Sequence, residues 1–175
     1  MAASTFPLNT TLPVANRRPW AAALSTEPST WQAILRILFA GVMLPHAGQH
    51  AFGLFGGFGF SGTLQWMTGT LGFPTALAAI AIVVEAAAPI ALIVGIGSRA
   101  AGLLLAVLMA TAASTHAANG FFMNWAGSLP AGSEGFEYHL LAIAVALTIA
   151  VRGGGSFSLD RLLERSDALK SEAAK

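Results

Sequence analysis

Residues 74–97 read PTALAAIAIVVEAAAPIALIVGIG, and within them only Glu85 carries a charge. A helix needs about 20 mostly apolar residues to cross the ~30 Å hydrocarbon core of a bilayer, and this stretch is long enough. Three more apolar stretches, at 31–51, 99–118 and 137–152, meet or approach that length. Together the four stretches predict an all-α integral membrane protein, a four-helix bundle.

The composition agrees with a membrane protein. Of the 175 residues, 55% are hydrophobic and 10% are charged, and the mean hydropathy is +0.67. Soluble domains are about 25% charged. A net charge of +1 without a basic cluster gives no sign of nucleic-acid binding. The chain has no cysteine, which excludes iron–sulfur clusters, cysteine-bound zinc and thioether-attached haem, so no covalent cofactor is expected.

Three regions follow from the distribution of apolar and polar residues. Residues 1–29 are rich in Ala, Ser, Thr and Pro and predict a disordered cytoplasmic arm without a cleaved signal peptide. Residues 30–155 hold the four apolar stretches and predict the transmembrane domain. Residues 156–175 predict a cytoplasmic tail, in which leucines at helical spacing indicate an amphipathic helix on the membrane surface.

Basic residues indicate the topology. They precede the first apolar stretch, lie between the second and third, and follow the fourth, whereas segments 52–73 and 119–136 contain no Lys or Arg. Positive charge is retained on the cytoplasmic side of membrane proteins. We therefore predict a multi-pass protein of the bacterial inner membrane, with both termini and the turn at Arg99 in the cytoplasm.

The segment after the first stretch alternates glycine and phenylalanine. Residues 52–60 read FGLFGGFGF, and a short interfacial helix is expected over 61–71. Glycine permits tight turns, and phenylalanine rings suit either a membrane interface or a stacking surface. The segment therefore predicts an aromatic anchor or, alternatively, a platform on which Phe55 and Phe58 hold a flat ring such as a quinone.

All four histidines are expected near the outer face. At a rise of 1.5 Å per residue, His46 lies ~22 Å and His116 ~25 Å from the cytoplasmic ends of their helices. His50 ends the first stretch, and Glu137 and His139 begin the fourth. Polar groups are unfavourable in hydrocarbon unless they have a partner, water or a function. With Asn124, these side chains predict a polar pocket beneath an aromatic lid.

Two charged side chains lie deeper in the predicted bundle. Glu85 is expected near mid-membrane, where apolar neighbours favour the neutral acid, so a hydrogen-bonded structural carboxyl and a proton carrier both remain open. Arg36 lies ~8 Å from the cytoplasmic face. It is expected to form a structural ion pair with Glu85 or to bond a carbonyl of a neighbouring helix.

The chain resembles the DoxX family of four-helix membrane proteins, which are related to the small subunit of thiosulfate:quinone oxidoreductase. The resemblance runs from about residue 35 to 160. It is carried by Arg36, 46–49 (HAGQ), 52–53 (FG), 55–59 (FGGFG), 62–63 (GT), Glu85, Gly95, Arg99, His116, 119–125 (NGFFMNW), 135–140 (GFEYHL) and 158–160 (SLD). Two positions depart from the family pattern: Ala47 replaces a glycine and His50 replaces a lysine. A histidine there can be neutral and can bind a proton or a metal.

Three classes of function fit these residues. The first is a quinone-interacting membrane subunit of an oxidoreductase system. In it Glu85 and His116 move protons as the catalytic pair, while the quinone is held by His46, His50, Phe55, Phe58, Asn124, Glu137 and His139. The second is a non-catalytic anchor or assembly partner for a soluble oxidoreductase. The third is a bundle that binds haem or a metal through histidines such as His46 and His116.

The expected partners are membrane lipid and an oxidoreductase subunit, with no nucleic acid. Small residues on several sides of the second stretch permit close helix packing, which allows a homo-oligomer.

The topology is testable because the chain has no cysteine of its own. A membrane-impermeant thiol reagent applied to the outer side should label Ser128→Cys and leave Arg99→Cys unlabelled. Labelling of position 99 without labelling of position 128 would show that the topology is inverted.

Overall fold

The computed structural model describes residues 24–130 and 132–173, which form helices and no strand. Each predicted apolar stretch corresponds to one long helix. The elements are α2 (Thr30–Phe52), η2 (Leu54–Gly56), α3 (Gly59–Gly69), α4 (Thr75–Val94), α5 (Ser98–His116), η3 (Ala117–Asn119), α6 (Glu137–Arg152) and α7 (Leu159–Ala173).

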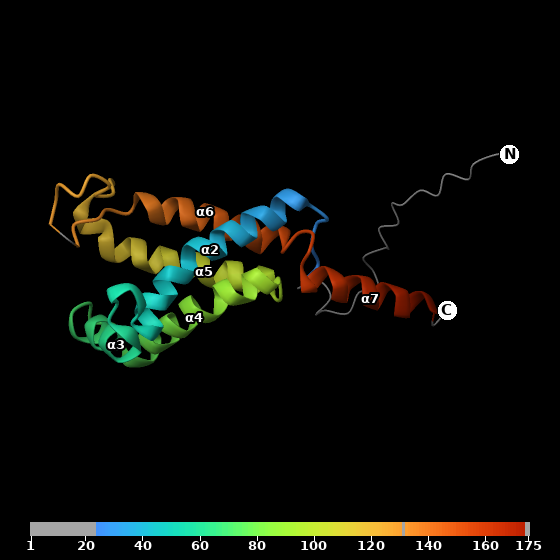
Figure 1. Ribbon diagram of the computed structural model, residues 1–175, viewed down its shortest axis with the longest axis horizontal. Coiled ribbons are helices and arrows are strands. Elements are labelled where there is room, and N and C mark those ends of the chain that lie inside the picture. Colours follow the sequence, from blue (N-terminus) through green and yellow to red (C-terminus); the bar gives the residue numbers. More distant parts are fainter. Residues whose placement is uncertain (1–23, 131, 174–175) are drawn as a thin grey trace.

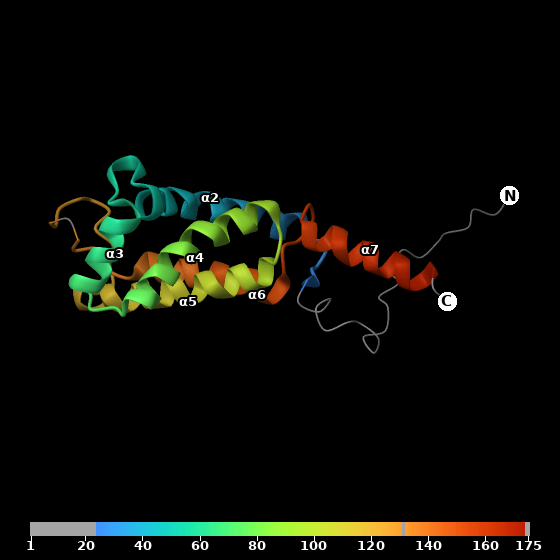
Figure 2. The same ribbon diagram turned by 90° about the horizontal axis from the view of Figure 1, so that it is seen from below.

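The four long helices α2, α4, α5 and α6 lie side by side and alternate in direction (Figures 1 and 2). At one end, α3 and the loop 120–136 connect the helices; we call it the histidine end, because His46, His50, His116 and His139 lie there. At the opposite, arginine end lie Arg36, Arg99 and Arg152, together with α7.

The core is built mainly from small and unbranched side chains, so the helices approach closely. Gly102 of α5 lies against the backbone of α6, and a Cβ there would come within 2.8 Å of the Ala146 carbonyl oxygen. The core cluster consists of the buried residues Phe39, Ala40, Met43, Ala88, Leu92, Ala101, Leu105, Ala106, Met109, Ala142, Ala146 and Ile149. Small residues at helix contacts are a feature of membrane proteins, where lipid is as apolar as the core.

Among the described residues, two helices are long and apolar enough to cross a membrane. These are Thr75–Val94, with a hydropathy of 2.5, and Ser98–Asn119, with a hydropathy of 1.6. Only 33% and 28% of these segments is buried, so most of their apolar surface faces outward. The core helix of a soluble protein would bury most of such a surface, and large exposed apolar surfaces mark sites of contact with lipid or protein.

The Arg36 guanidinium is fully buried at the arginine end, with 0% of the residue exposed. Its Nε donates to the Gly154 carbonyl oxygen at 2.9 Å, and its Nη2 donates to that of Phe157 at 3.2 Å. Nη1 donates to the carbonyls of Leu92 and Ile93 in the last turn of α4, where helix carbonyls lack an intrahelical partner. The predicted ion pair with Glu85 is therefore wrong, and the alternative of carbonyl partners is confirmed.

Asp160 accepts hydrogen bonds at a helix N-terminus, that of α5. Its carboxylate accepts hydrogen bonds from the backbone N–H groups of Gly97 at 2.7 Å and Ser98 at 2.8 Å, where α5 begins. Helix N-termini present free N–H groups and favour a negative charge. The first turn of α7 is thereby fastened to the turn between α4 and α5.

Residues 24–29, the end of the arm predicted over residues 1–29, make defined contacts with the arginine end; residues 1–23 lie outside the described residues. The Thr26 hydroxyl accepts from the Gly155 N–H at 2.6 Å, and the Ser25 carbonyl accepts from Arg99 Nε at 2.8 Å. Ser29 caps α2 by accepting from the Gln32 N–H at 3.2 Å. The segment is fixed because it supplies partners for backbone and arginine groups at the arginine end.

The predicted tail helix forms as α7. It continues away from the arginine end, roughly along the long helices (Figures 1 and 2). Its predicted placement on the membrane surface stays a prediction. The bonds of Asp160 to α5 hold the first turn of α7 and set this direction.

Replacing Arg36 by glutamine should strongly destabilise the protein. The variant leaves buried carbonyls without donors, and we expect the free energy of unfolding to fall by about 3 kcal/mol or more. Thermal or denaturant unfolding in detergent measures this loss. The matched control is Arg152→Gln, whose exposed pair with Glu27 at 3.5 Å should contribute less than about 1 kcal/mol. Equal losses in both variants would contradict the role of Arg36.

Candidate functional site at the histidine end

His50 and Glu85 form a close pair between α2 and α4. The His50 Nδ1 lies 2.7 Å from the Glu85 Oε2. Glu85 is buried, with 8% of the residue exposed, while the His50 side chain is 37% exposed. The buried Glu85 carboxyl is thus hydrogen-bonded to an imidazole, that of His50, which is partly exposed on the outside of the helices. A carboxyl and an imidazole in hydrogen-bond contact can share and exchange a proton.

His116 and His139 form a second pair, between the last turn of α5 and the first turn of α6. Their ring centroids are 4.9 Å apart and the rings are tilted by 31°. The His116 Nδ1–H donates to the Glu134 carbonyl at 2.8 Å, which leaves Nε2 of the neutral ring as an acceptor. His139 is buried, and its Nδ1 has no hydrogen-bond partner of normal geometry among the described residues.

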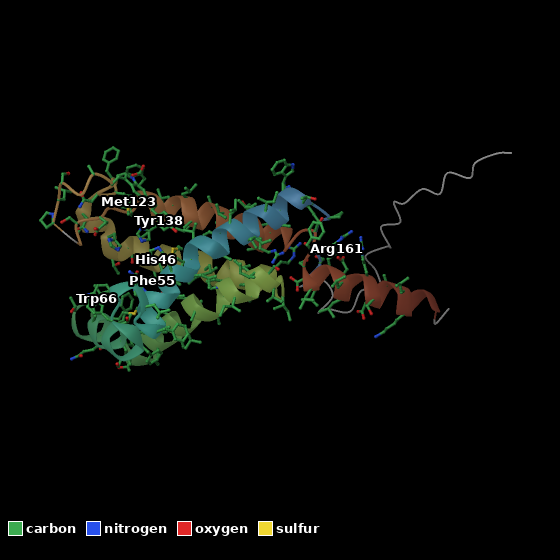
Figure 3. All side chains as sticks on the ribbon, in the orientation of Figure 1. His46, Phe55, Trp66, Met123, Tyr138 and Arg161 are labelled. Carbon is green, nitrogen blue, oxygen red and sulfur yellow. The ribbon has the colours of Figure 1, made fainter. Side chains whose placement is uncertain are left out.

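His46 lies on α2 and is exposed. It is near enough to His139 for the two rings to interact electrostatically. The labels of Figure 3 place His46 at the histidine end with Phe55 and Tyr138. The predicted gathering of histidines at one end is therefore observed, but as two separate groups. In the first group, His50 joins Glu85 at the α2–α4 contact. The second group consists of His46 on α2, His116 on α5 and His139 on α6.

Glu85 and His116, the predicted proton-moving pair, each have a different hydrogen-bond partner. No hydrogen bond joins them in the part of the chain that the structure describes; Glu85 bonds His50 and His116 bonds the Glu134 backbone. Nor do the described residues hold a group of three or more His, Asp or Glu side chains arranged to bind a metal ion.

Glu137 and Asn124 fasten the loop 120–136. The Glu137 Oε2 accepts from the Met123 N–H at 3.2 Å and from the Trp125 Nε1–H at 3.4 Å. The Asn124 side chain accepts from the Leu129 N–H at 3.1 Å and donates to its carbonyl at 2.9 Å. Neither side chain is hydrogen-bonded to a histidine in the described residues. These contacts give both side chains a structural role that the expected quinone site did not include.

The segment 52–60 forms a tight turn with outward rings. Phe55 has a left-handed backbone, φ 52°, and is 74% exposed, while Phe58 is 71% exposed. The Gln49 amide donates to the Phe55 carbonyl at 3.4 Å. Gly57 packs on the backbone of Gln49 so closely that any Cβ would clash. Outward rings fit both an interfacial anchor and a stacking surface.

An apolar groove between α2 and α6 was not predicted from the sequence. It has a volume of about 190 Å³ and is lined by Leu35, Leu38, Phe39, Val42, Tyr138, Leu141, Ala142 and Val145. Tyr138 is the polar member, and it precedes His139 in the first turn of α6. Its hydroxyl lies 4.0 Å from the Met43 sulfur, a weak partner. In the sequence, Tyr138 was the one sign of this groove, and a tyrosine at that position suggests only an aromatic residue at the membrane interface.

The groove has room for a small ring. A cavity of about 150 Å³ lined by Leu, Ile and Phe in another protein binds benzene. At the histidine end the groove adds a phenol hydroxyl that can donate a hydrogen bond, with His139 and His46 nearby. An apolar slot with a few polar groups at one end is typical of small-molecule sites.

Comparison with known proteins gives one match. The DoxX family model matches residues 31–125, more than half of the chain. The matched segment contains α2 to α5, and with them Arg36, His46, His50, Glu85 and His116. It ends before α6, so Tyr138 and His139 lie outside it. No curated protein and no solved structure matches the chain.

Proposed function

The chain belongs to the DoxX family, a membrane family, and on this premise we propose that α2, α4, α5 and α6 cross the bacterial inner membrane as a four-helix bundle. The outward apolar surfaces of α4 and α5 support this arrangement. The arginine end is cytoplasmic, because the loops at the histidine end contain no Lys or Arg. The histidine end then lies at the outer face.

We propose further that the protein binds a membrane-soluble quinone as the membrane subunit of an oxidoreductase system. The observation that carries this proposal is the apolar groove of about 190 Å³ between α2 and α6 that includes Tyr138. The groove opens toward lipid, from which an apolar ring can enter. The Tyr138 hydroxyl can donate to one quinone carbonyl, and the imidazoles of His46 and His139 are the nearest candidates for the other.

Quinone reduction consumes two electrons and two protons for each quinol formed. The electrons come from a partner protein that acts as the donor. The His50–Glu85 pair lies on the α4 side of α2, away from the groove, and in this proposal it is a proton reservoir, because Glu85 is buried and His50 connects it to the exterior. His116 and His139 supply the second polar route next to the groove. On this account His50, rather than His116, is the direct proton partner of Glu85.

A non-catalytic anchor for a soluble oxidoreductase is the second candidate function. The observation that favours it is α7, which extends away from the arginine end and exposes 60% of Leu162 and 67% of Leu169. A soluble partner could pack on these leucines without any chemistry at the histidine end. The two functions differ in two expectations: whether the groove binds a quinone, and whether replacing Glu85 slows the reduction of that quinone.

Filling the groove should abolish quinone binding. Val42 is 49% exposed on the groove wall, and Val42→Trp places an indole in the space for the ring. We expect at least tenfold weaker binding of a short-chain quinone, measured by calorimetry on detergent-solubilised protein. Val107→Trp is the matched control, because Val107 is 59% exposed on α5 and lies outside the groove. Equal affinity in the two variants would exclude this groove as the site.

Glu85→Gln tests the proton pair separately from binding. Glutamine can keep the hydrogen bond to His50 but cannot release a proton, so quinone affinity should hold. Reduction of the bound quinone by dithionite, followed by stopped-flow absorbance, should slow at least tenfold. The control is Glu134→Gln, which removes the same charge in the loop. An unchanged rate would make Glu85 structural and favour the anchor.

A further inference from the structure

A second cavity lies at the arginine end, between the last turn of α4 and the first two turns of α7. Its volume is about 500 Å³. Its walls are mostly apolar, with two serines, Ser156 and Ser158, and two guanidinium groups as the polar members. The side chains that matter here are Val94, Phe157, Leu159, Leu162, Arg161 and Arg165. This combination of an apolar surface and positive charge is not used by the proposed quinone site.

The aromatic wall of this cavity is held in place by the buried arginine. Phe157 is 82% exposed and has a left-handed backbone, φ 58°, which is unfavourable for a residue other than glycine. Its carbonyl accepts from the Arg36 Nη2 at 3.2 Å, and the following Ser158 hydroxyl donates to the Gly155 carbonyl at 2.8 Å. The cavity wall is therefore formed in advance of any ligand.

The two arginines are available to a ligand. Arg161 and Arg165 lie one turn apart on α7, so their side chains share a face. Arg161 makes one long hydrogen bond, 3.5 Å to the Thr26 carbonyl, and Arg165 makes no hydrogen bond or ion pair among the described residues. The neighbouring Asp160 is already bound to the start of α5, and Glu164 bonds the Thr26 N–H at 3.4 Å.

An apolar surface continues from the cavity along α4. Ile90, Ile93 and Val94 are 54%, 41% and 45% exposed. In the proposed membrane arrangement this surface faces acyl chains, and the cavity lies where helices end and headgroups begin. Guanidinium groups bind phosphate with paired hydrogen bonds. We infer that the cavity binds the phosphate of an anionic phospholipid, with the acyl chains of that lipid along α4.

This inference rests on the proposed membrane arrangement and not on quinone binding. The test is calorimetry of the full chain in a neutral maltoside detergent, titrated with dihexanoyl phosphatidylglycerol, dihexanoyl phosphatidylcholine or inorganic phosphate. We expect phosphatidylglycerol to bind at least tenfold more tightly than either of the others. Equal binding of the two lipids would overturn the inference, and equal binding of inorganic phosphate would reduce the site to an anion site.

Variants locate the binding in the cavity. Arg161→Gln together with Arg165→Gln should weaken phosphatidylglycerol binding at least tenfold, whereas Arg152→Gln, at the same end but outside the cavity, should leave it unchanged. Phe157→Gly suits the left-handed backbone and removes only the ring, so binding should fall severalfold without loss of thermal stability. An unchanged affinity in the double variant would overturn the inference. Should that variant misfold, the comparison of the two lipids on the unaltered protein decides. Quinone affinity serves as the independent readout, since the double variant should retain it.

Discussion

The buried guanidinium of Arg36 donates hydrogen bonds to backbone carbonyl groups that have no donor within a helix. These hydrogen bonds hold the arginine end together. Leu92 and Ile93 end α4, while Gly154 and Phe157 belong to the linker between α6 and α7. A helix terminus buried without donors is strongly unfavourable. One planar group with five N–H donors can serve all four carbonyls, whereas a lysine ammonium has only three donors. The position of α7, and with it the cavity beside Phe157, depends on this contact.

The two ends of the molecule differ in how completely their buried ionisable side chains are hydrogen-bonded, although the buried Ser98 hydroxyl at the arginine end also has no hydrogen-bond partner among the described residues. At the arginine end, Arg36 and Asp160 are buried, and each meets backbone partners from other elements. At the histidine end, within the part of the chain that the structure describes, the buried His139 Nδ1 has no hydrogen-bond partner of normal geometry, and the Tyr138 hydroxyl has only the Met43 sulfur as a partner. His46 is exposed. Unsatisfied polar groups are unfavourable for stability and are tolerated mainly at functional sites. This contrast is the reason for assigning the chemistry to the histidine end and a structural role to most charged groups at the other.

Helix packing explains where the groove lies. The contact between α5 and α6 is close, because Gly102 meets the backbone at Ala146 and Ala150. The contact between α2 and α6 is more open, and there the side chains of Leu38, Val42 and Leu141 border an unfilled space. A small-residue contact on one side of α6 and a large-residue contact on the other thus produce both a close helix pair and an open groove on the outside of the helices.

Hydrophobic patterning alone determined the four long helices, the short helix after the first of them and the amphipathic tail, because burial in an apolar environment requires long apolar stretches. It did not determine the partners of polar residues. Depth along each helix was estimated as if the helices were parallel, which placed Glu85 near Arg36 and below the histidines. In the structure α2 and α4 are tilted, and Glu85 meets His50. Asn124 and Glu137 bond within their own loop, and residues 24–29 bond to distant backbone. Such partners depend on the tilt and rotation of whole helices, which are set by packing across the fold and not by the local sequence.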